Sequence, residues 1–188
     1  MPEYLESDLT FVFPDDWRVR QFDATVAYRS VSGRGIKGVD FVAISPDGAL
    51  WLVEVKNYRP RYKGDREYLA RRKDPAALAA AVSAKFRDSI RLIHVIRAHI
   101  HGSALRRLQL WYRVHLRPSR GSNYLFWHDA HRLAARGRAV EYVLWMETPE
   151  ANDDYDHRVY TELRRQLPDR NIIVAEQDAP RGLPFGVR

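Results

Sequence analysis

The chain has 188 residues, 45% of them hydrophobic, with a formal net charge of +7 and no cysteine. This length and apolar content suit one buried core, so we expect a single domain over residues 1–188. The absence of cysteine excludes a disulfide framework. The absence of an apolar N-terminal leader and of a long apolar run predicts a cytoplasmic protein without a membrane partner.

Charge is distributed unevenly along the chain. Residues 1–16 carry five acidic residues and no lysine or arginine, whereas 57–73 carry seven basic residues against two acidic, and 85–120 carry nine against one. Basic segments of this kind are typical of polyanion binding, although a basic helix face is also commonly just solvated. We therefore expect a nucleic-acid partner. We favour DNA over RNA, although the sequence does not decide between them, and a homo-oligomer is compatible with the sequence.

The N-terminal region is interpreted in three pieces. Tyr4–Leu9 indicates one or two turns of helix, and Trp17–Val31 alternates apolar and polar residues as a half-buried strand does. Residues 33–38 match GxGxxG, but a dinucleotide site needs a helix after this motif and here a strand follows, so we interpret it as a connection between strands. Two basic residues of this connection are candidates for phosphate contacts: Arg34 and Lys37.

A β-hairpin is predicted next, with strands Val39–Ser45 and Ala49–Val55 joined by Pro46-Asp47-Gly48. Proline suits the first position of this turn because its ring fixes φ, and glycine suits the left-handed third position. The three-residue loop sets the register of the two strands. In that register Asp40 lies directly opposite Glu54.

One corner of this hairpin is charged, and both of its faces are otherwise apolar. Asp40 faces Glu54 there, and Lys56 lies one pair beyond on the same face. Like charges directly opposite one another destabilise a sheet by roughly 0.2–1 kcal/mol, and burial increases the cost. A hard cation such as Mg²⁺ would remove the conflict, with the carbonyl of Val55 as a further ligand. The alternative is a solvated ion-pair cluster that contributes little to stability.

The combination of Asp40, the hairpin and Glu54-Val55-Lys56 resembles the PD-(D/E)xK nuclease superfamily, which has the restriction-endonuclease-like fold. Val39 stands where the family has proline, a departure that touches no ligand. The resemblance implies an α/β fold with a mixed central β-sheet flanked by helices. It divides the chain into a motif-bearing core at about residues 17–116, C-terminal strands and helices at 117–178, and an irregular tail at 179–188.

The same resemblance implies Mg²⁺-dependent hydrolysis of phosphodiester bonds, with Mn²⁺ able to substitute. Asp40, Glu54 and the Val55 carbonyl would hold the cation, and Lys56 would orient the attacking water or stabilise charge on the phosphoryl oxygens. Two residues are candidates for the N-terminal glutamate that often helps the metal in this family: Glu3 and Glu6. The rival hypotheses are a catalytically silent nucleic-acid-binding or assembly module that keeps the fold, and a metal-stabilised structural domain.

Basic and aromatic residues are interleaved directly after the hairpin. Aromatic rings can stack on unpaired bases while arginine and lysine neutralise phosphates, although tyrosines in a surface loop can equally cover a sheet edge. The candidates for nucleic-acid contact in this segment are Asn57, Tyr58, Arg59, Arg61, Tyr62 and Lys63.

The C-terminal half predicts alternating helices and strands. A cap and first-turn proline at Asp74-Pro75 and a glycine at Gly102 bound a helix of some 26 residues that should cover one face of the hairpin. Within a second helix, His128 and His131 stand one turn apart, as ligands of a transition metal or as ordinary half-buried histidines. The other predicted elements are a strand over Leu108–Leu116, the second helix over Tyr124–Arg136, a strand over Glu141–Glu147, a helix over Asp154–Leu167 and a strand over Asn171–Glu176.

Overall fold

The computed structural model describes residues 1–29, 36–60, 65, 72–117, 119, 121–137, 139–148, 153–177 and 180–188. The strands are β1 (Glu3–Glu6), β2 (Leu9–Val12), β3 (Arg18–Gln21), β4 (Phe41–Ile44), β5 (Leu50–Asn57), β6 (Val140–Glu147), β7 (Asn171–Ala175) and β8 (Gly186–Val187). The helices are α1 (Val26–Arg29), α3 (Pro75–His101), α4 (Ala104–His115), α5 (Asn123–Arg136) and α6 (Asp153–Gln166).

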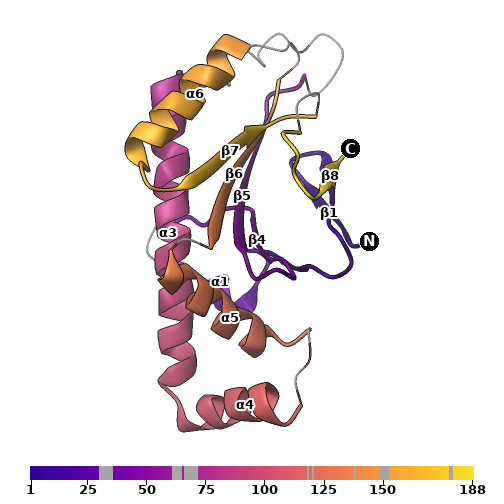
Figure 1. Cartoon of the computed structure of the whole chain (residues 1–188), viewed down its shortest axis with the longest axis vertical. Coiled ribbons are helices and arrows are strands. Elements are labelled where there is room, and N and C mark those ends of the chain that lie inside the picture. Colours follow the sequence, from indigo (N-terminus) through magenta and orange to yellow (C-terminus); the bar gives the residue numbers. More distant parts are fainter. Residues whose placement is uncertain are drawn as a thin grey trace.

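A mixed five-stranded sheet in the order β3-β4-β5-β6-β7 forms the middle layer of the molecule. Its first three strands pair antiparallel, and β5, β6 and β7 pair parallel. Helices α3, α5 and α6 lie on one side, and the small sheet β1-β2-β8 lies on the other (Figure 1). The predicted α/β class with a mixed sheet flanked by helices is confirmed.

The hairpin that carries the charged corner folds in the predicted register. Val42 pairs with Leu52 and Ile44 with Leu50. The turn is closed by hydrogen bonds from Ser45 N to Ala49 O and from Gly48 N to Ser45 O, both 3.0 Å long. Gly48 has a φ of 84°, the left-handed conformation that glycine adopts without steric cost.

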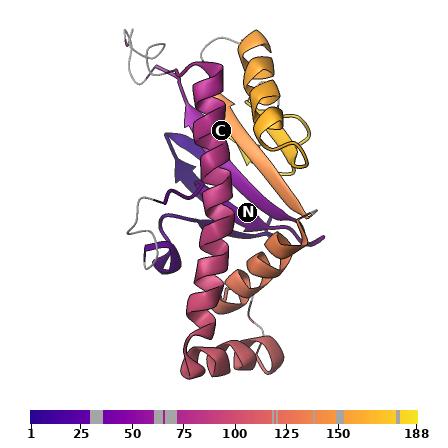
Figure 2. The same ribbon diagram turned by 90° about the vertical axis from the view of Figure 1, so that its left-hand side faces the viewer.

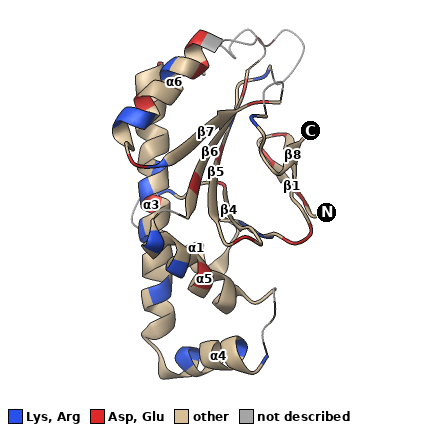
Figure 3. Ribbon diagram, viewed as in Figure 1, with Lys and Arg blue, Asp and Glu red and all other residues tan. Residues whose placement is uncertain are grey.

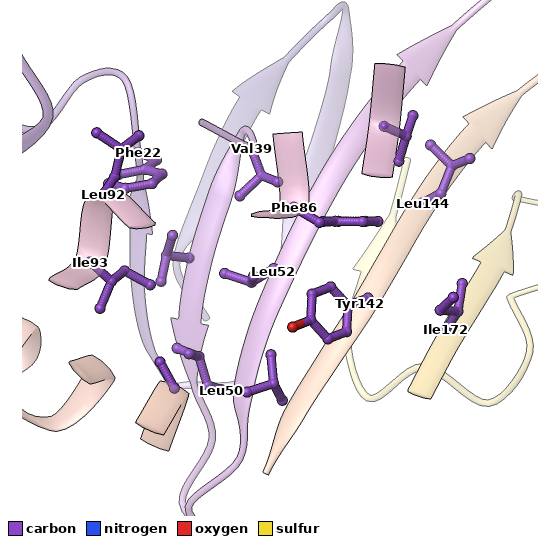
Figure 4. Close-up of a cluster of buried hydrophobic side chains, with 14 of the residues drawn as sticks. Phe22, Val39, Leu50, Leu52, Phe86, Leu92, Ile93, Tyr142, Leu144 and Ile172 are labelled. Carbon is purple, nitrogen blue, oxygen red and sulfur yellow. The ribbon is translucent and has the colours of Figure 1, made fainter. Parts of the chain in front are cut away.

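Helix α3 covers one face of the hairpin, as predicted. The Asp74 side chain caps its first turn by accepting hydrogen bonds from the backbone N–H groups of Ala76 and Ala77. Phe86, Leu92 and Ile93 of α3 point toward the sheet, where they meet Leu52 and neighbouring side chains of β4, β5 and β6 (Figure 4). The helix continues past the end of the sheet and carries α4 across its far end (Figure 2).

The opposite face of the sheet is buried under the small sheet β1-β2-β8. Aromatic rings dominate this second core: Phe11 lies 5.1 Å from Phe41 and Phe13 lies 4.8 Å from Phe185, measured between ring centroids. The β4 and β5 residues in this core are the alternate set expected from the two-residue period of a strand, namely Phe41, Ala43, Trp51, Val53 and Val55.

The N-terminal segment is a β-hairpin, so the predicted helix over Tyr4–Leu9 is wrong. Ser7 and Asp8 have φ values of 51° and 64°, the pair of positive angles that a two-residue type I′ turn requires. Because neither residue is glycine, the sequence does not indicate this turn. The tail contributes β8, which pairs with Phe11 and Val12 and corrects the expectation of an irregular end.

The predicted strand over Trp17–Val31 ends early, after Gln21. The chain turns at Phe22, and Thr25 Oγ1 accepts a hydrogen bond from Tyr28 N, which caps the short helix α1. The rings of Phe22 and Tyr28 then pack 5.1 Å apart. A local side-chain cap and this ring contact therefore outweigh the alternating pattern.

The predicted strand over Leu108–Leu116 is also wrong, because this segment lies in and directly after helix α4. Leu110 and Val114, four residues apart, face the body of the protein. The alternation of apolar residues fitted a strand, but the segment consists largely of good helix formers. The later predictions are confirmed to within a residue or two: α5, β6, α6 and β7.

Among the described residues, no helix has the length and apolar character needed to cross a bilayer.

Candidate active site at the end of the β4–β5 pair

Asp40 lies just before β4 and is fixed by two backbone contacts. Its carbonyl accepts a hydrogen bond from Phe22 N at 2.8 Å, and its carboxylate Oδ2 accepts one from Val55 N at 2.6 Å. The β4–β5 ladder starts at Phe41, so the Asp40 side chain supplies an acceptor that a continued strand would otherwise provide. The other carboxylate oxygen, Oδ1, faces helix α3.

Glu54 lies opposite Asp40, and its side chain has no exposed surface. Lys85 of α3 donates to both of its oxygens, at 2.7 Å to Oε1 and 2.9 Å to Oε2. Lys56 donates to Glu54 Oε1 and, at 3.0 Å, to the carbonyl of Val55. The Lys85 ammonium also lies 3.9 Å from Asp40 Oδ1, so it bridges the two carboxylates.

The charged corner is therefore a partly buried quartet of two carboxylates and two ammoniums: Asp40, Glu54, Lys56 and Lys85. Burial and the neighbouring charge of Glu54 raise the pKa of Asp40 to about 7, against the opposing effects of Lys85 and of the hydrogen bond from Val55 N. Burial lowers the pKa of Lys85, but the attraction of Glu54 and Asp40 outweighs it and leaves that pKa raised. The Asp40 carboxyl group is thus harder to ionise than an ordinary aspartate, because burial and Glu54 raise its pKa.

Sequence reasoning missed Lys85, although its spacing carries a signal. Lys85 occupies a sheet-facing position of α3, three residues after the buried Val82 and four before the buried Ser89. A lysine in such an apolar stripe needs a buried anion. Ser89 fixes the same region, because its hydroxyl accepts a hydrogen bond from Val39 N at 2.9 Å, next to Asp40.

The nucleic-acid candidates that the structure describes are placed differently from one another. Lys37 is exposed. Tyr58 is 6% exposed and packs in the core beneath α3, so its ring is not available to stack on a base. Asn57 donates to Ser7 O, and Arg59 forms an ion pair with Glu147 at 2.7 Å. Four further candidates lie outside the described residues: Arg34, Arg61, Tyr62 and Lys63.

Glu3 and Glu6 lie on the wrong side of the sheet for the quartet. Both belong to β1, in the small sheet that covers the face bearing Phe41, whereas Asp40 and Glu54 face α3. Glu3 instead forms an ion pair with Arg188. The sequence leaves open whether either glutamate joins the metal site, and the structure places neither of them beside the quartet.

The histidines of α5 are half-buried residues at its packing interface with α3. The His131 ring lies 4.8 Å from the ring of His94, and burial followed by the charge of Arg97 lowers the pKa of His128. Within the part of the chain that the structure describes, no three His, Cys, Asp or Glu side chains form a group able to hold a metal ion. A site at the quartet would accordingly combine two carboxylates with a backbone carbonyl.

Comparison of the chain with family models, with curated proteins and with solved structures finds no match.

Proposed function

We propose that this chain is a Mg²⁺-dependent nuclease that hydrolyses phosphodiester bonds of nucleic acid, with DNA as the preferred substrate. One observation carries the proposal. Asp40, Glu54 and the Val55 carbonyl converge at the end of one strand pair, beside the two lysines Lys56 and Lys85. The mixed sheet flanked by helices supports it as well, since this is the architecture that the resemblance to PD-(D/E)xK nucleases implies.

The quartet fits a hard divalent cation by its donor chemistry. Asp40 Oδ1, the Glu54 carboxylate and the Val55 carbonyl are oxygen ligands of the kind that Mg²⁺ takes. The Lys85 ammonium already lies between the two carboxylates, which shows that this position attracts positive charge. Binding of Mg²⁺ would displace that ammonium from Asp40 and require Asp40 to be ionised.

The residues of the quartet have separable roles in this proposal. When bound, Mg²⁺ would polarise the scissile phosphate and lower the pKa of a bound water. Lys56, 29% exposed, reaches the solvent side of the quartet and can donate a hydrogen bond to that water or to a phosphoryl oxygen. Hydrolysis adds the water oxygen to phosphorus, breaks the bond to the leaving oxygen and delivers one proton to it.

We assign substrate contacts to basic and polar residues that lie close to the hairpin in the sequence. Lys37 is exposed and can reach a phosphate backbone. Asn57, one residue beyond Lys56, would have to release its hydrogen bond to Ser7 O to do so. Arg59 would have to share its guanidinium between phosphate and Glu147. Arg34, Arg61, Tyr62 and Lys63 complete the proposed surface on the basis of sequence alone.

A catalytically silent nucleic-acid-binding or assembly module is the second candidate. The observation in its favour is the electrical balance of the quartet. Two lysines neutralise two carboxylates, and Lys85 donates to both Glu54 oxygens. A quartet that is satisfied in this way stabilises the fold without any metal.

The decisive experiment is incubation with labelled single- and double-stranded DNA and RNA, in Mg²⁺, in Mn²⁺ and in chelator. We expect cleavage only with metal, reduced about a hundredfold or more by Asp40→Ala, Glu54→Ala or Lys56→Ala. Asp88→Asn, which removes a carboxylate elsewhere on α3, is the matched control and should cleave as wild type does. Equal activity in wild type and the three variants would refute the nuclease; binding without cleavage would leave the silent module.

A further inference from the structure

Among the described residues, the outer surface of α4 and its C-cap residue carry an exposed apolar stripe. Its five members are between 41% and 65% exposed: Leu105, Leu108, Trp111, Tyr112 and Leu116. Leu105, Leu108 and Tyr112 are spaced three and four residues apart, so they lie along one side of the helix. Leu110 and Val114 already anchor the other side to the body. The exposed side is therefore not needed to hold α4 in place.

The surroundings of this α4 stripe are basic. Helix α4 contains three arginines and no acidic residue, and α3 before it carries three arginines and one lysine against one aspartate (Figure 3). The acidic side chains of the neighbouring helices are already paired, Asp88 with Arg91 and Asp129 with Arg18. A partner for the stripe would thus meet positive charge at its rim.

A hollow of about 950 Å³ adjoins the stripe. It is lined by Leu108, Trp111 and Tyr112 of α4 and by Ser122, Asn123 and Tyr124 at the start of α5. Apolar side chains and polar groups converge there, as they do in sites that bind a side chain of a partner.

We propose that the α4 stripe docks a protein partner that presents an amphipathic helix with an apolar face bordered by acidic residues. The three- and four-residue spacing of Leu105, Leu108 and Tyr112 matches the ridges that pack between two helices, and acidic borders complement the arginines. This docking surface is independent of the quartet at Asp40 and holds whether or not the chain is a nuclease.

Other occupants fit these observations less well. A second copy would bring arginines against arginines, because α4 has no acidic residue to pair with them. A bilayer surface is too flat to fill the hollow beside Trp111. Nucleic acid stacks on Trp111 and Tyr112 but gains little from three exposed leucines.

The test uses two designed helical peptides with the same leucine face, one bordered by glutamate and the other by lysine. Fluorescence anisotropy with the full chain should show the glutamate peptide binding about tenfold or more tightly than the lysine peptide. That preference should shrink in roughly 0.5 M salt, since salt screens charges at an exposed rim.

Variants locate the binding surface. Leu105→Gln/Leu108→Gln should lose binding of the glutamate peptide with an unchanged melting temperature, because both side chains are exposed. The matched control is Val95→Gln, which changes an apolar residue of α3 that is 46% exposed and outside the stripe, and it should bind as wild type does.

Four outcomes would overturn the proposal: equal binding of the two peptides, binding that survives the double variant, α4-dependent self-association in sedimentation experiments, or α4-dependent binding to anionic vesicles or single-stranded DNA without binding of the glutamate peptide.

Discussion

Two buried glutamates stand near the carboxyl ends of adjacent parallel strands, Glu54 on β5 and Glu147 on β6, and they are held by different kinds of group. Glu147 accepts hydrogen bonds from the indole of Trp145 at 2.8 Å and from Gln177 N at 3.0 Å, and it pairs with Arg59. Glu54 is held by two lysine ammoniums, beside a second carboxylate.

This difference suggests that the Glu147 carboxylate has a structural role, whereas the partners of the Glu54 carboxylate can be exchanged. The indole of Trp145 and the backbone N–H of Gln177 are held in place by the fold, so these two partners of Glu147 cannot move aside as a long side chain can. The ammoniums of Lys56 and Lys85 are at the ends of flexible stems and can move aside. In addition, Asp40 faces Glu54, and its raised pKa shows that its ionisation is costly. Of these two glutamates, Glu54 is therefore the one to which we assign the proposed cation.

The largest effect is expected for Lys85→Met, which leaves Glu54 buried with one fewer countercharge. We expect a loss of about 3 kcal/mol in the free energy of unfolding without metal, as for other buried ion pairs that lose one partner. Mg²⁺ should restore more stability to this variant than to wild type, because it takes the place of the missing ammonium. Urea unfolding with and without Mg²⁺ measures both.

The control for that comparison is Arg91→Met, which removes an exposed positive charge from α3 and should change stability by no more than about 0.5 kcal/mol. A Lys85→Met protein as stable as wild type, or one indifferent to Mg²⁺, would contradict the description of Lys85 as a bridging cation.

Glu147→Gln tests the other glutamate and should have an intermediate effect. Glutamine keeps an acceptor for Trp145 but loses the charge that pairs with Arg59, so we expect a loss of about 1–2 kcal/mol. The response of the melting temperature to Mg²⁺ should be unchanged. A diminished Mg²⁺ response would show that the two glutamates are not functionally distinct.

The smallest effect is expected for Asp40→Asn without metal, and it depends on pH. The pKa of Asp40 is about 7 in the folded protein against 3.8 for an ordinary aspartate, so the folded state binds more protons between these values. The wild type therefore loses stability as pH rises from about 4 to 7, and the asparagine variant lacks this loss. At about pH 8 the free energy of unfolding of the variant should equal that of wild type or exceed it by up to about 1 kcal/mol.

Chemical denaturation of both proteins at about pH 4.5 and about pH 8, on either side of the Asp40 titration, measures the difference directly. Parallel pH profiles would mean that Asp40 is ionised at ordinary cost. They would favour the solvated ion-pair cluster over a strained pair of carboxylates.

Much of this site could be predicted because it is local. Pro46-Asp47-Gly48 determines the register of one hairpin, and that register alone places Asp40 opposite Glu54. To predict the role of Lys85, one must know which face of α3 meets the sheet. Its contact with Glu54 joins residues 31 positions apart, and no local pattern specifies that pairing. The periodicity of α3 predicts that face, so a lysine within its apolar stripe is the signal to look for.

The wrong predictions about the fold also concern features that the local sequence pattern does not indicate. The β1–β2 turn uses positive φ at Ser7 and Asp8, which composition does not announce, and β8 gains its conformation from pairing with β2. In α4 the apolar residues alternate as in a strand, but several of them are exposed, and the segment also contains residues that favour helix. Exposed apolar residues disturb period-based prediction because they do not mark a core.

Thermal melting in chelator and in Mg²⁺ or Mn²⁺ tests the claim that Asp40 and Glu54 together bind a divalent cation. At an ion concentration about a hundredfold above the dissociation constant, the wild-type melting temperature should rise by roughly 5–10 °C, because the ion binds only the folded state. Asp40→Asn should show a smaller rise or none. A wild-type melting temperature that is the same in chelator and in both metals would contradict the claim.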